Sequence, residues 1–553
     1  MIRRIFGRTS ASSLLLCLLL AASIALSVVT LWSTSQNLMD SDSSSEMVLA
    51  QHLYEKGGIL SEDWCYSTEI RAFYMQLVFT PLFALFDDWS MVRFVGTVIL
   101  HLALVASYGC LVHAAGMKRK AFYIGGSLLL MPISVAYGRI VLYHSYYILS
   151  LVASFLLTAL VLYIMKDVRR KRFGWLVLHT VILLALAFVS ALNGYRQIAI
   201  TQVPLALVAV VWMFQAKTRR DGMEAFVMLC ASGAAAVAGL AGLVVNMGWH
   251  DVYTFVDYSG MRLVMISPTK LIGMLFGLLH PFGYRREMML LTVTGLLSVM
   301  GAIVCVFCVL HGLRAVLSGA PKRTPGERVV EYLFPCAMSV VGLIFLLTRQ
   351  NNYAELYFLP YAVWFIPMLS LVATTLPDRQ SDECPKIPAW LTSQKLVVYA
   401  LVGVCLLNGL VNMRCFMRPE AFGQPYEGIE HMETDTVALL SGARDYLVEE
   451  GYDLGYATFW RANVMAEMSD GKLRQVAVHI PEGEKELAYY DWLSLKSNRT
   501  MDAKKPYLLL GESELHLLQG TAMEQAVQQA CEINGFVIYD IVDLPLWREL
   551  LER

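Results

Sequence analysis

Long apolar segments recur along most of this chain, and their length limits what it can fold into. Each runs for roughly 20 residues, the length that an α-helix needs to cross the hydrocarbon core of a bilayer. Helices satisfy their own backbone hydrogen bonds in lipid, so the pattern predicts a polytopic α-helical membrane protein. The eleven spans that we predict cover residues 12–32, 90–115, 121–138, 146–165, 174–192, 198–215, 223–247, 288–311, 329–347, 358–376 and 396–413.

Composition agrees with a membrane protein and argues against several other classes. Hydrophobic residues make up 57% of the 553 residues and charged residues only 16%, which is unusual for a soluble domain. The formal net charge of −1 provides no overall positive field that would attract nucleic acid. We therefore expect membrane lipid, and no nucleic acid, among the partners.

Clusters of positive charge orient the predicted spans. Basic loops are retained on the cytoplasmic side of a membrane, and the basic loops here lie at 118–120, 166–172, 217–220, 314–328 and 379–395. The N-terminal Met1–Arg8 is also basic, and the apolar run after it is long enough to be an uncleaved first helix instead of a signal peptide. The apolar run Phe73–Phe86 is too short to span. We expect a multi-pass protein of the plasma membrane with a cytoplasmic N-terminus and an external C-terminal domain.

The sequence divides into a transmembrane domain at 1–414, with a first external loop at 33–89, and an external soluble α/β domain at 415–553. The C-terminal part contains short apolar segments typical of strands, separated by helical stretches. The predicted strands are Gly455–Thr458, Gln475–Ile480, Tyr507–Leu510 and Phe536–Ile541, and the predicted helices are Glu433–Glu450, Arg461–Met468 and Glu484–Ser494.

An acidic stretch, Met39–Met47, follows directly after the first span. It contains Asp40, Asp42 and Glu46, together with three serines. Asp and Ser are common helix N-caps, so one interpretation is a polar loop that caps the next helix. The other interpretation is a carboxylate that takes a proton from an acceptor hydroxyl. The sequence leaves both open.

The external loops place cations and hydrogen-bonding side chains at the ends of the spans. Positive charge on this side is disfavoured, so its repetition needs a reason. Membrane anchoring of single side chains is one reason, and an anionic ligand such as a lipid phosphate is another, because the planar guanidinium of Arg matches phosphate oxygens. The candidates are His144, Arg196, Arg285, Arg349 and Tyr353.

An acidic pair in the first external loop, directly after the first helix, resembles the GT-C superfamily of polyprenyl-phosphate-dependent glycosyltransferases. Protein mannosyltransferases and aminoarabinose transferases belong to this superfamily. The segment Arg349–Pro360 is similar to the polar entrance of a late helix in these proteins, although Glu355 stands where members often carry Arg. The resemblance covers roughly residues 1–415, mainly as topology, and its only compact motif is Asp40-Ser41-Asp42.

The resemblance implies a hexosyltransferase-type enzyme of the cell envelope. It would move a sugar from a polyprenyl-phosphate donor to a glycan or protein acceptor on the outer face. Asp42 or Asp40 would be the catalytic base, and Arg196, Arg349 and Arg285 would bind the donor phosphate, with Glu46, His144 and Tyr353 as further substrate-binding residues. The two alternatives are a lipid-linked glycan transporter, flippase or polymerase, and a non-catalytic GT-C-like subunit.

Two further questions stay open in the sequence. Asp40, Asp42 and Glu46 offer the oxygen ligands that a divalent metal prefers, so a metal site there stays open. The sequence indicates no other cofactor, and the lipid-phosphate sugar is the donor substrate. Cys65 and Cys531 both fall outside the predicted spans and could pair.

Overall fold

The computed structural model forms two compact units, each assembled from separate parts of the chain. It describes residues 11–35, 38–256, 262–265, 267–285, 289–320, 323–349, 354–375, 394–417, 434–481 and 486–552. The membrane unit comprises Met1–Thr30, Val98–Val245 and Gly260–Gly423, and the second unit comprises Leu31–Thr97, Asn246–Ser259 and Gln424–Arg553. The predicted boundary near residue 415 follows chain order, whereas the second unit joins the first loop to the C-terminal segment.

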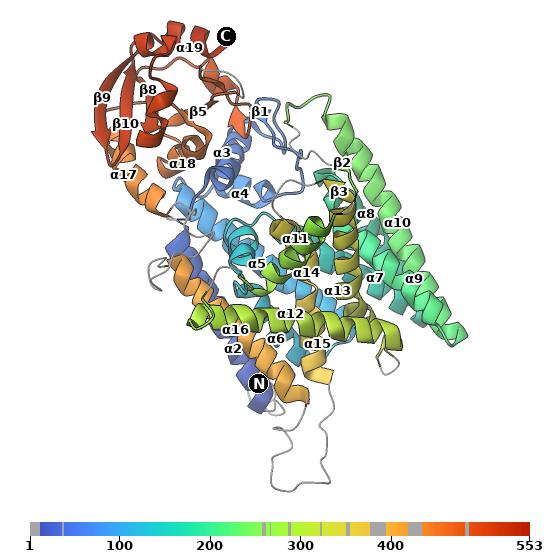
Figure 1. The fold of residues 1–553 in the computed structure, drawn as a ribbon. Helices are drawn as coiled ribbons and strands as arrows, with labels where there is room; N and C mark the ends of the chain where they lie inside the picture. Colours follow the sequence, from blue (N-terminus) through green and yellow to red (C-terminus); the bar gives the residue numbers. More distant parts are fainter. Residues whose placement is uncertain are drawn as a thin grey trace. The chain divides into compact units, whose positions relative to one another are not determined.

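Ten helices within the described residues are long and apolar enough to cross a membrane, and each corresponds to one of the eleven predicted spans (Figure 1). This confirms a polytopic helical membrane protein. The helices are α2 (Ala11–Thr34), α5 (Trp89–Ala115), α7 (Ile148–Arg170), α8 (Phe173–Ser190) with the turn η2 (Ala191–Asn193), η3 (Ile198–Gln202) with α9 (Val203–Gln215), α10 (Arg219–Trp249), α12 (Val293–Ser318), α13 (Pro325–Leu347), α14 (Ala354–Ala362) with α15 (Phe365–Thr375), and α16 (Gln394–Met417).

The predicted span 121–138 is instead broken into two pieces. Helix α6 (Arg119–Leu130) has only 12 residues and ends before Pro132. The proline ring excludes helical backbone at the preceding residue, and Met131 is accordingly extended, with ψ of 129°. The chain re-forms as a π-helix, η1 (Tyr137–Tyr143). The prediction of one continuous helix here was wrong because it counted apolar residues and passed over the proline.

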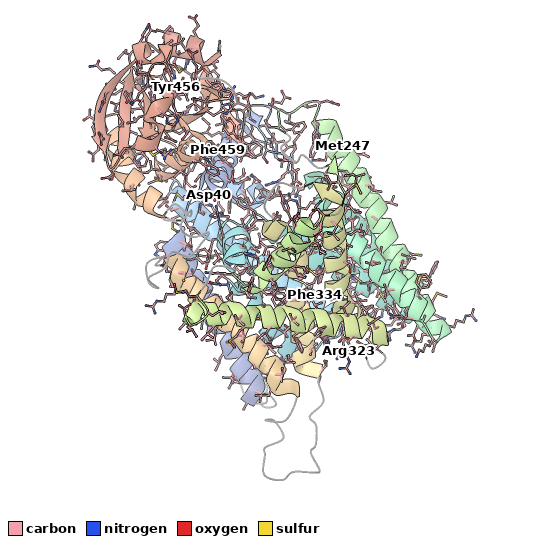
Figure 2. The ribbon with its side chains drawn as sticks, in the orientation of Figure 1. Asp40, Met247, Arg323, Phe334, Tyr456 and Phe459 are labelled. Atoms are coloured by element: carbon pink, nitrogen blue, oxygen red, sulfur yellow. The ribbon has the colours of Figure 1, made fainter. Side chains whose placement is uncertain are left out.

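The segment between the predicted spans 223–247 and 288–311 contains a further helix, α11 (Pro268–Leu279). Ser267 begins it, its side chain accepting a hydrogen bond from the amide of Lys270. The turn η4 (His280–Phe282) follows, and the Phe282 ring packs on Phe365 and Phe334, with centroid distances of 4.5 and 6.1 Å. Phe334 is labelled in Figure 2 and is fully buried. Ahead of α11, strand β2 (Arg262–Leu263) pairs antiparallel with β3 (Thr348–Arg349).

In the second unit, the loop after the first span (residues 33–89) contains two helices. Helix α3 (Ser41–Lys56) ends at Gly57 and Gly58, whose φ angles of 78° and 100° suit glycine. Helix α4 (Gln76–Leu82) lies within the apolar run Phe73–Phe86 and has seven residues, too few to span a membrane. Strand β1 (Trp64–Cys65) pairs antiparallel with β7 (Ser494–Leu495) of the C-terminal segment.

The C-terminal segment contains a six-stranded mixed sheet in the order β6-β5-β4-β8-β10-β9, drawn in red in Figure 1. The strands are β4 (Leu454–Thr458), β5 (Arg474–His479), β6 (Ala488–Tyr489), β8 (Pro506–Gly511), β9 (Val527–Ile533) and β10 (Phe536–Ile541). The helices are α17 (Thr434–Glu449), α18 (Phe459–Met468) and α19 (Leu544–Glu552), with 3-10 turns η6 (Ser497–Arg499), η7 (Glu512–Leu517) and η8 (Ala522–Ala526).

Each face of this sheet has its own apolar core. Two consecutive residues of β4 show the division. Tyr456, labelled in Figure 2, packs with Trp547 on one face, and Ala457 packs with residues of α17 and α18 on the other. The four predicted strands and two of the predicted helices are present. The predicted helix Glu484–Ser494 is wrong in its described part, where β6 and the start of β7 lie. Strand β9 was missed because its sequence, VQQACEI, is too polar to give an apolar signal.

Candidate functional site

Asp40 begins helix α3 as its N-cap. Its Oδ1 accepts a hydrogen bond of 2.7 Å from the amide of Ser43, and its own amide donates to Ser43 Oγ at 3.1 Å. This reciprocal pair is a capping box, in which the side chain satisfies an amide that has no partner within the helix. Asp40 is buried and engaged in this role. The capping interpretation therefore describes Asp40.

Asp42 and Glu46 lie one turn apart and share a face of α3. Residues four apart on a helix are neighbours on its surface, so the two carboxylates interact. Asp42 is half-buried and lies in the first turn of the helix. Of the three acidic residues in the stretch, Asp42 and Glu46 lie on one face of α3, apart from the capping hydrogen bonds of Asp40.

Glu46 is buried among polar and charged neighbours. Burial, reinforced by the charge of Asp42, raises its pKa to about 7, although Arg71, Gln76 and Arg93 act in the opposite direction. Gln76 of α4 donates a hydrogen bond to Glu46 Oε2, and Arg71 NH1 lies 4.0 Å from Glu46 Oε1. Glu46 therefore changes its charge near neutral pH, as groups at catalytic sites often do.

Arg71 and Gln76 were not predicted as site residues. Arg71 also lies 3.4 Å from Glu69, and its guanidinium stacks over Tyr74 at 4.7 Å from the ring centroid. Both residues fall in or next to the apolar run that we judged too short to span. The length of that run was used only to infer the topology. No sequence pattern linked Arg71 or Gln76 to Glu46, which lies some 25–30 residues earlier.

In the membrane unit, Arg196 lies on a tight turn between α8 and η3. Gly194 adopts φ of 86°, which lets the chain reverse. Gln197, directly after Arg196, donates to Ser154 Oγ at 3.0 Å and to Thr201 Oγ1 at 2.9 Å, which ties the turn to α7. The π-helix η3 follows at once. Such widened turns are frequent at functional sites.

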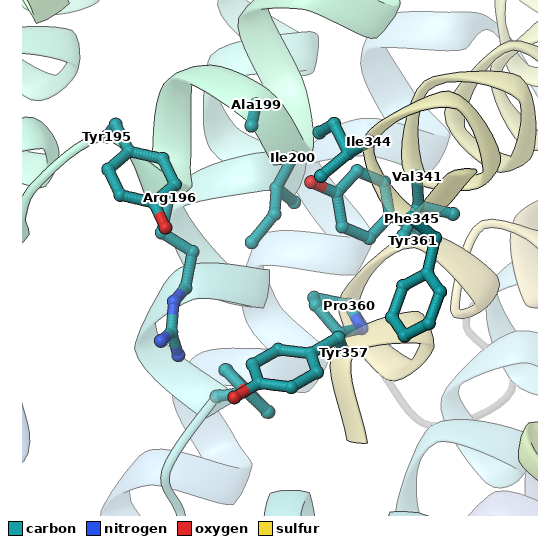
Figure 3. Close-up of a pocket in the computed structure, with 11 residues that line it drawn as sticks. Tyr195, Arg196, Ala199, Ile200, Val341, Ile344, Phe345, Tyr357, Pro360 and Tyr361 are labelled. Carbon is teal, nitrogen blue, oxygen red and sulfur yellow. The ribbon is translucent and has the colours of Figure 1, made fainter. Parts of the chain in front are cut away.

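Arg196 lines a cavity with about 500 Å³ of space not filled by protein atoms. Its guanidinium lies over the ring of Tyr147, 5.1 Å from the centroid. Figure 3 shows the Arg196 guanidinium and the Tyr357 ring at one end of the pocket and Ile344 at the other. The pocket is lined by Tyr147, Tyr195, Arg196, Ala199, Ile200, Val341, Ile344, Phe345, Tyr357, Pro360 and Tyr361.

This lining combines one cation, several tyrosines and an aliphatic wall. A guanidinium with nearby phenol groups suits an anion such as a phosphate, and the aliphatic wall suits a hydrocarbon chain. Arg196 was predicted as a phosphate ligand. Tyr147 and Tyr361 lie inside predicted spans and Tyr357 lies next to one, so none of the three was predicted as a site residue.

Arg285 and His144 have other surroundings in the membrane unit. Arg285 donates to Asn412 Oδ1 at 3.0 Å, and its backbone amide donates to Ser298 Oγ at 2.7 Å, so it links α12 and α16. His144 is buried just after η1 and meets the Tyr146 ring edge-on. Neither residue lines the Arg196 pocket.

The remaining predicted residues are described in part or not at all. The backbone of Arg349 lies in β3, opposite that of Arg262. Tyr353 lies outside the described residues. The roles of Arg349 and Tyr353 in substrate binding stay predictions.

The described part of the chain contains no group of three or more His, Cys, Asp or Glu side chains that could hold a metal ion.

Cys65 and Cys531 are both free thiols. Cys65 Sγ lies 3.6 Å from Asp491 Oδ1, while Cys531 lies in β9 at the opposite edge of the C-terminal sheet from β6. The proposed pairing of these two cysteines is therefore not present.

Comparisons with known proteins identify the fold. The sequence matches no protein-family model and no curated protein. Among solved structures, ArnT from Cupriavidus metallidurans bound to undecaprenyl phosphate is similar, with a TM-score of 0.54, 13% identity, and coverage of 96% of this chain and 99% of that one. Its apo form matches with a TM-score of 0.54 and 12% identity over 97% and 99% of the two chains.

Arabinofuranosyltransferase AftD from mycobacteria is also matched, with a TM-score of 0.45, 11% identity, and coverage of 94% of this chain and 40% of AftD. The likeness to ArnT runs over nearly the whole of both chains and includes the membrane helices and the C-terminal sheet-containing part. It confirms the GT-C-type fold that the sequence predicted.

Proposed function

We propose that this multi-pass membrane protein is a glycosyltransferase that moves a sugar from a polyprenyl-phosphate donor to an acceptor on the outer face of the membrane. The observation that carries the proposal is the likeness, over nearly its full length, to an ArnT structure bound to undecaprenyl phosphate. At 13% identity this likeness establishes the fold, so the chemistry must be argued from the side chains of this chain.

The donor would bind at the Arg196 pocket. Its leaving phosphate needs a cation, because negative charge builds up there as the bond to the sugar breaks. Arg196 provides that cation, and the Tyr147 ring against it restricts the orientation of the guanidinium. The aliphatic side chains Ile200, Ile344 and Val341 provide the contact that the polyprenyl chain requires.

Asp42 would be the base. The acceptor hydroxyl gives its proton to the Asp42 carboxylate as its oxygen attacks the anomeric carbon of the sugar. The bond between that carbon and the phosphate oxygen then breaks, and the lipid phosphate leaves with the electron pair. Glu46 would adjust the charge around Asp42, since it changes protonation near neutral pH. Asp40 would hold the start of α3 and take no part in proton transfer.

The pocket can be tested by binding before the sugar is known. Undecaprenyl phosphate and undecaprenol are compared as ligands of the purified protein in detergent, by native mass spectrometry. Because phosphate recognition depends on Arg196, we expect Arg196→Ala to weaken undecaprenyl phosphate binding by about 10- to 100-fold, the value of a hydrogen bond to a charged group. Arg196→Lys should retain part of the affinity.

Arg220→Ala is the matched control, since Arg220 is an exposed arginine at the first turn of α10, beside Glu224. It should bind undecaprenyl phosphate as the wild type does. Equal binding of undecaprenol and undecaprenyl phosphate, or an unchanged affinity in Arg196→Ala, would show that the phosphate does not bind at this pocket.

A further inference from the structure

Arg93, near the start of α5, joins three segments of the second unit. Its Nε and NH2 donate to the two carboxylate oxygens of Glu467 on α18, each at 2.6 Å, and NH2 also donates to the Ser43 carbonyl of α3 at 3.0 Å. Arg93, Glu467 and Ser43 are 4%, 2% and 1% exposed. A forked guanidinium–carboxylate pair fixes geometry in a way that a single contact does not.

Helix α18 also bonds Ser41, the residue before Asp42. The Ser41 hydroxyl donates to the carbonyl of Phe459, and Asn463 Nδ2 lies 3.5 Å from the Ser41 carbonyl and donates to Leu493 O at 3.1 Å. Phe459, which accepts this bond, and Asp40, which precedes Ser41, are labelled in Figure 2. Met39 packs in the apolar core between the sheet and helices α17 and α18.

The start of α3 is therefore attached directly to the C-terminal segment at Met39 and Ser41, and at Ser43 through Arg93, which pairs with Glu467. Asp42 is the half-buried residue among these buried ones. A helix whose start is held at Ser41 by α18 and at Ser43 by Arg93 of α5 cannot rotate freely about its axis, so these contacts restrain the directions of Asp42 and Glu46.

A buried ion pair is a poor way to gain stability, because desolvating both charges offsets their attraction. Apolar side chains of the same size would hold α3 against α18 about as firmly. Their contacts would not be directional, however, and they could not bond the Ser43 carbonyl. The pair is therefore better explained by orientation than by stability.

We propose that Arg93 and Glu467 are positioning residues, and that the C-terminal segment orients the Asp42–Glu46 face of α3 for proton transfer. This inference rests on the proposed function, since it gives the second unit a part in that reaction. It also assigns the C-terminal segment a role that does not require it to bind the acceptor.

The test separates transfer from donor binding. Glu467→Gln keeps the shape of the side chain but removes its charge and the forked pairing. Sugar transfer is measured in membranes of the native host by mass spectrometry of the glycan product. We expect it to fall by about 10- to 100-fold, which is the effect of a misplaced reacting group. Binding of undecaprenyl phosphate by the purified protein should stay within twofold of wild type, because Arg196 is untouched.

Glu514→Gln is the matched control. Glu514 pairs with Arg461, which is also on α18, and the two side chains bond Thr458 and the Gly511 amide. It should leave transfer within twofold of wild type. Loss of transfer in Glu514→Gln equal to that in Glu467→Gln would overturn the proposal, because any disturbance of α18 would then be sufficient. Unchanged transfer in Glu467→Gln would also overturn it.

Glu467→Asp covers the case in which Glu467→Gln does not fold. It keeps the charge but draws the carboxylate back from Arg93, so transfer should fall by about tenfold or more at an unchanged melting temperature. Unchanged transfer in this variant would also overturn the proposal. Asp42→Asn, assayed alongside, distinguishes the two proposals. Full transfer in Asp42→Asn refutes the assignment of the base. Loss of transfer in Asp42→Asn, together with full transfer in Glu467→Gln, refutes only the positioning role.

Discussion

At the scale of single residues, the most informative difference is between Asp40 and Asp42. The sequence offered a helix cap and a catalytic base for the same stretch, and it could not say which residue took which role. The structure assigns the cap to Asp40 through two hydrogen bonds with Ser43. This distinction depends on where the helix begins, and Ser and Asp recur so closely from Asp40 to Ser45 that several start points fit the sequence equally well.

Glu46 gives a prediction on pH. Its pKa is raised from 4.5 to about 7 by burial, so the folded state keeps a proton that the unfolded state has already lost. Stability therefore falls as pH rises from about 4.5 to 7, by up to about 3 kcal/mol. Glu46→Gln removes this dependence and can still accept the hydrogen bond from Gln76. The melting temperature of Glu46→Gln minus that of wild type should be larger at pH 8 than at pH 5.

The measurement is thermal unfolding of both proteins in detergent at the two pH values. Glu55→Gln is the control, because Glu55 is an exposed carboxylate on the same helix. Its difference from wild type should be the same at both pH values. If wild type and Glu46→Gln depend on pH equally, Glu46 is not the group that retains the proton.

At the scale of helices and strands, close packing between α8 and α10 supports the Arg196 turn. A Cβ on Gly242 would lie 2.2 Å from the carbonyl oxygen of Phe188 and 3.3 Å from Ala191 Cβ. The first of these is backbone and cannot move aside alone. Phe188 and Ala191 come just before the turn that carries Arg196, so their displacement would reach the pocket.

Gly242→Ala should therefore lower the melting temperature through overpacking, which costs about 1–3 kcal/mol, and should weaken undecaprenyl phosphate binding. Gly233→Ala on the same helix meets nothing within 4 Å. There the loss of glycine's flexibility should leave the protein unchanged or more stable by about 0.5–1 kcal/mol. Thermal unfolding compares the two variants. Equal effects at the two positions would contradict the tight contact between these helices.

Most of these elements could be predicted from the sequence, and the failures have physical causes. Ten spans were found because an uninterrupted apolar run of about 20 residues is rare outside membrane-spanning helices. The break at Pro132 depends on one residue, and α11 was overlooked because its 12 residues, with Lys270 among them, are too few and too polar to indicate a span. Strand β9 is stabilised by pairing with β10, a contact that its own polar sequence does not reveal.

At the scale of the whole molecule, the two compact units of the structure combine segments that are distant in the sequence. Chain order suggested that the first loop belongs with the membrane helices. In the structure, Arg93 pairs with Glu467, 374 residues later, and β1 pairs with β7, so the loop and the C-terminal segment fold together. A single sequence contains no signal for contacts between residues so far apart, and the pocket tyrosines were missed for the same reason.

The central claim is that this protein transfers a sugar with Asp42 as the base. The most direct measurement compares the surface glycans of the native host, by mass spectrometry, when the protein is wild type, Asp42→Asn or Asp40→Asn. Both variants preserve side-chain volume, and Asn is as good an N-cap as Asp, so Asp40→Asn is a control two residues from the base. Protein level in the membrane is measured in parallel.

We expect one glycan to lack a single sugar in Asp42→Asn, while the glycans of Asp40→Asn match wild type. Complete glycans in Asp42→Asn, with the variant present in the membrane at the wild-type level, would contradict the assignment of Asp42 as the base.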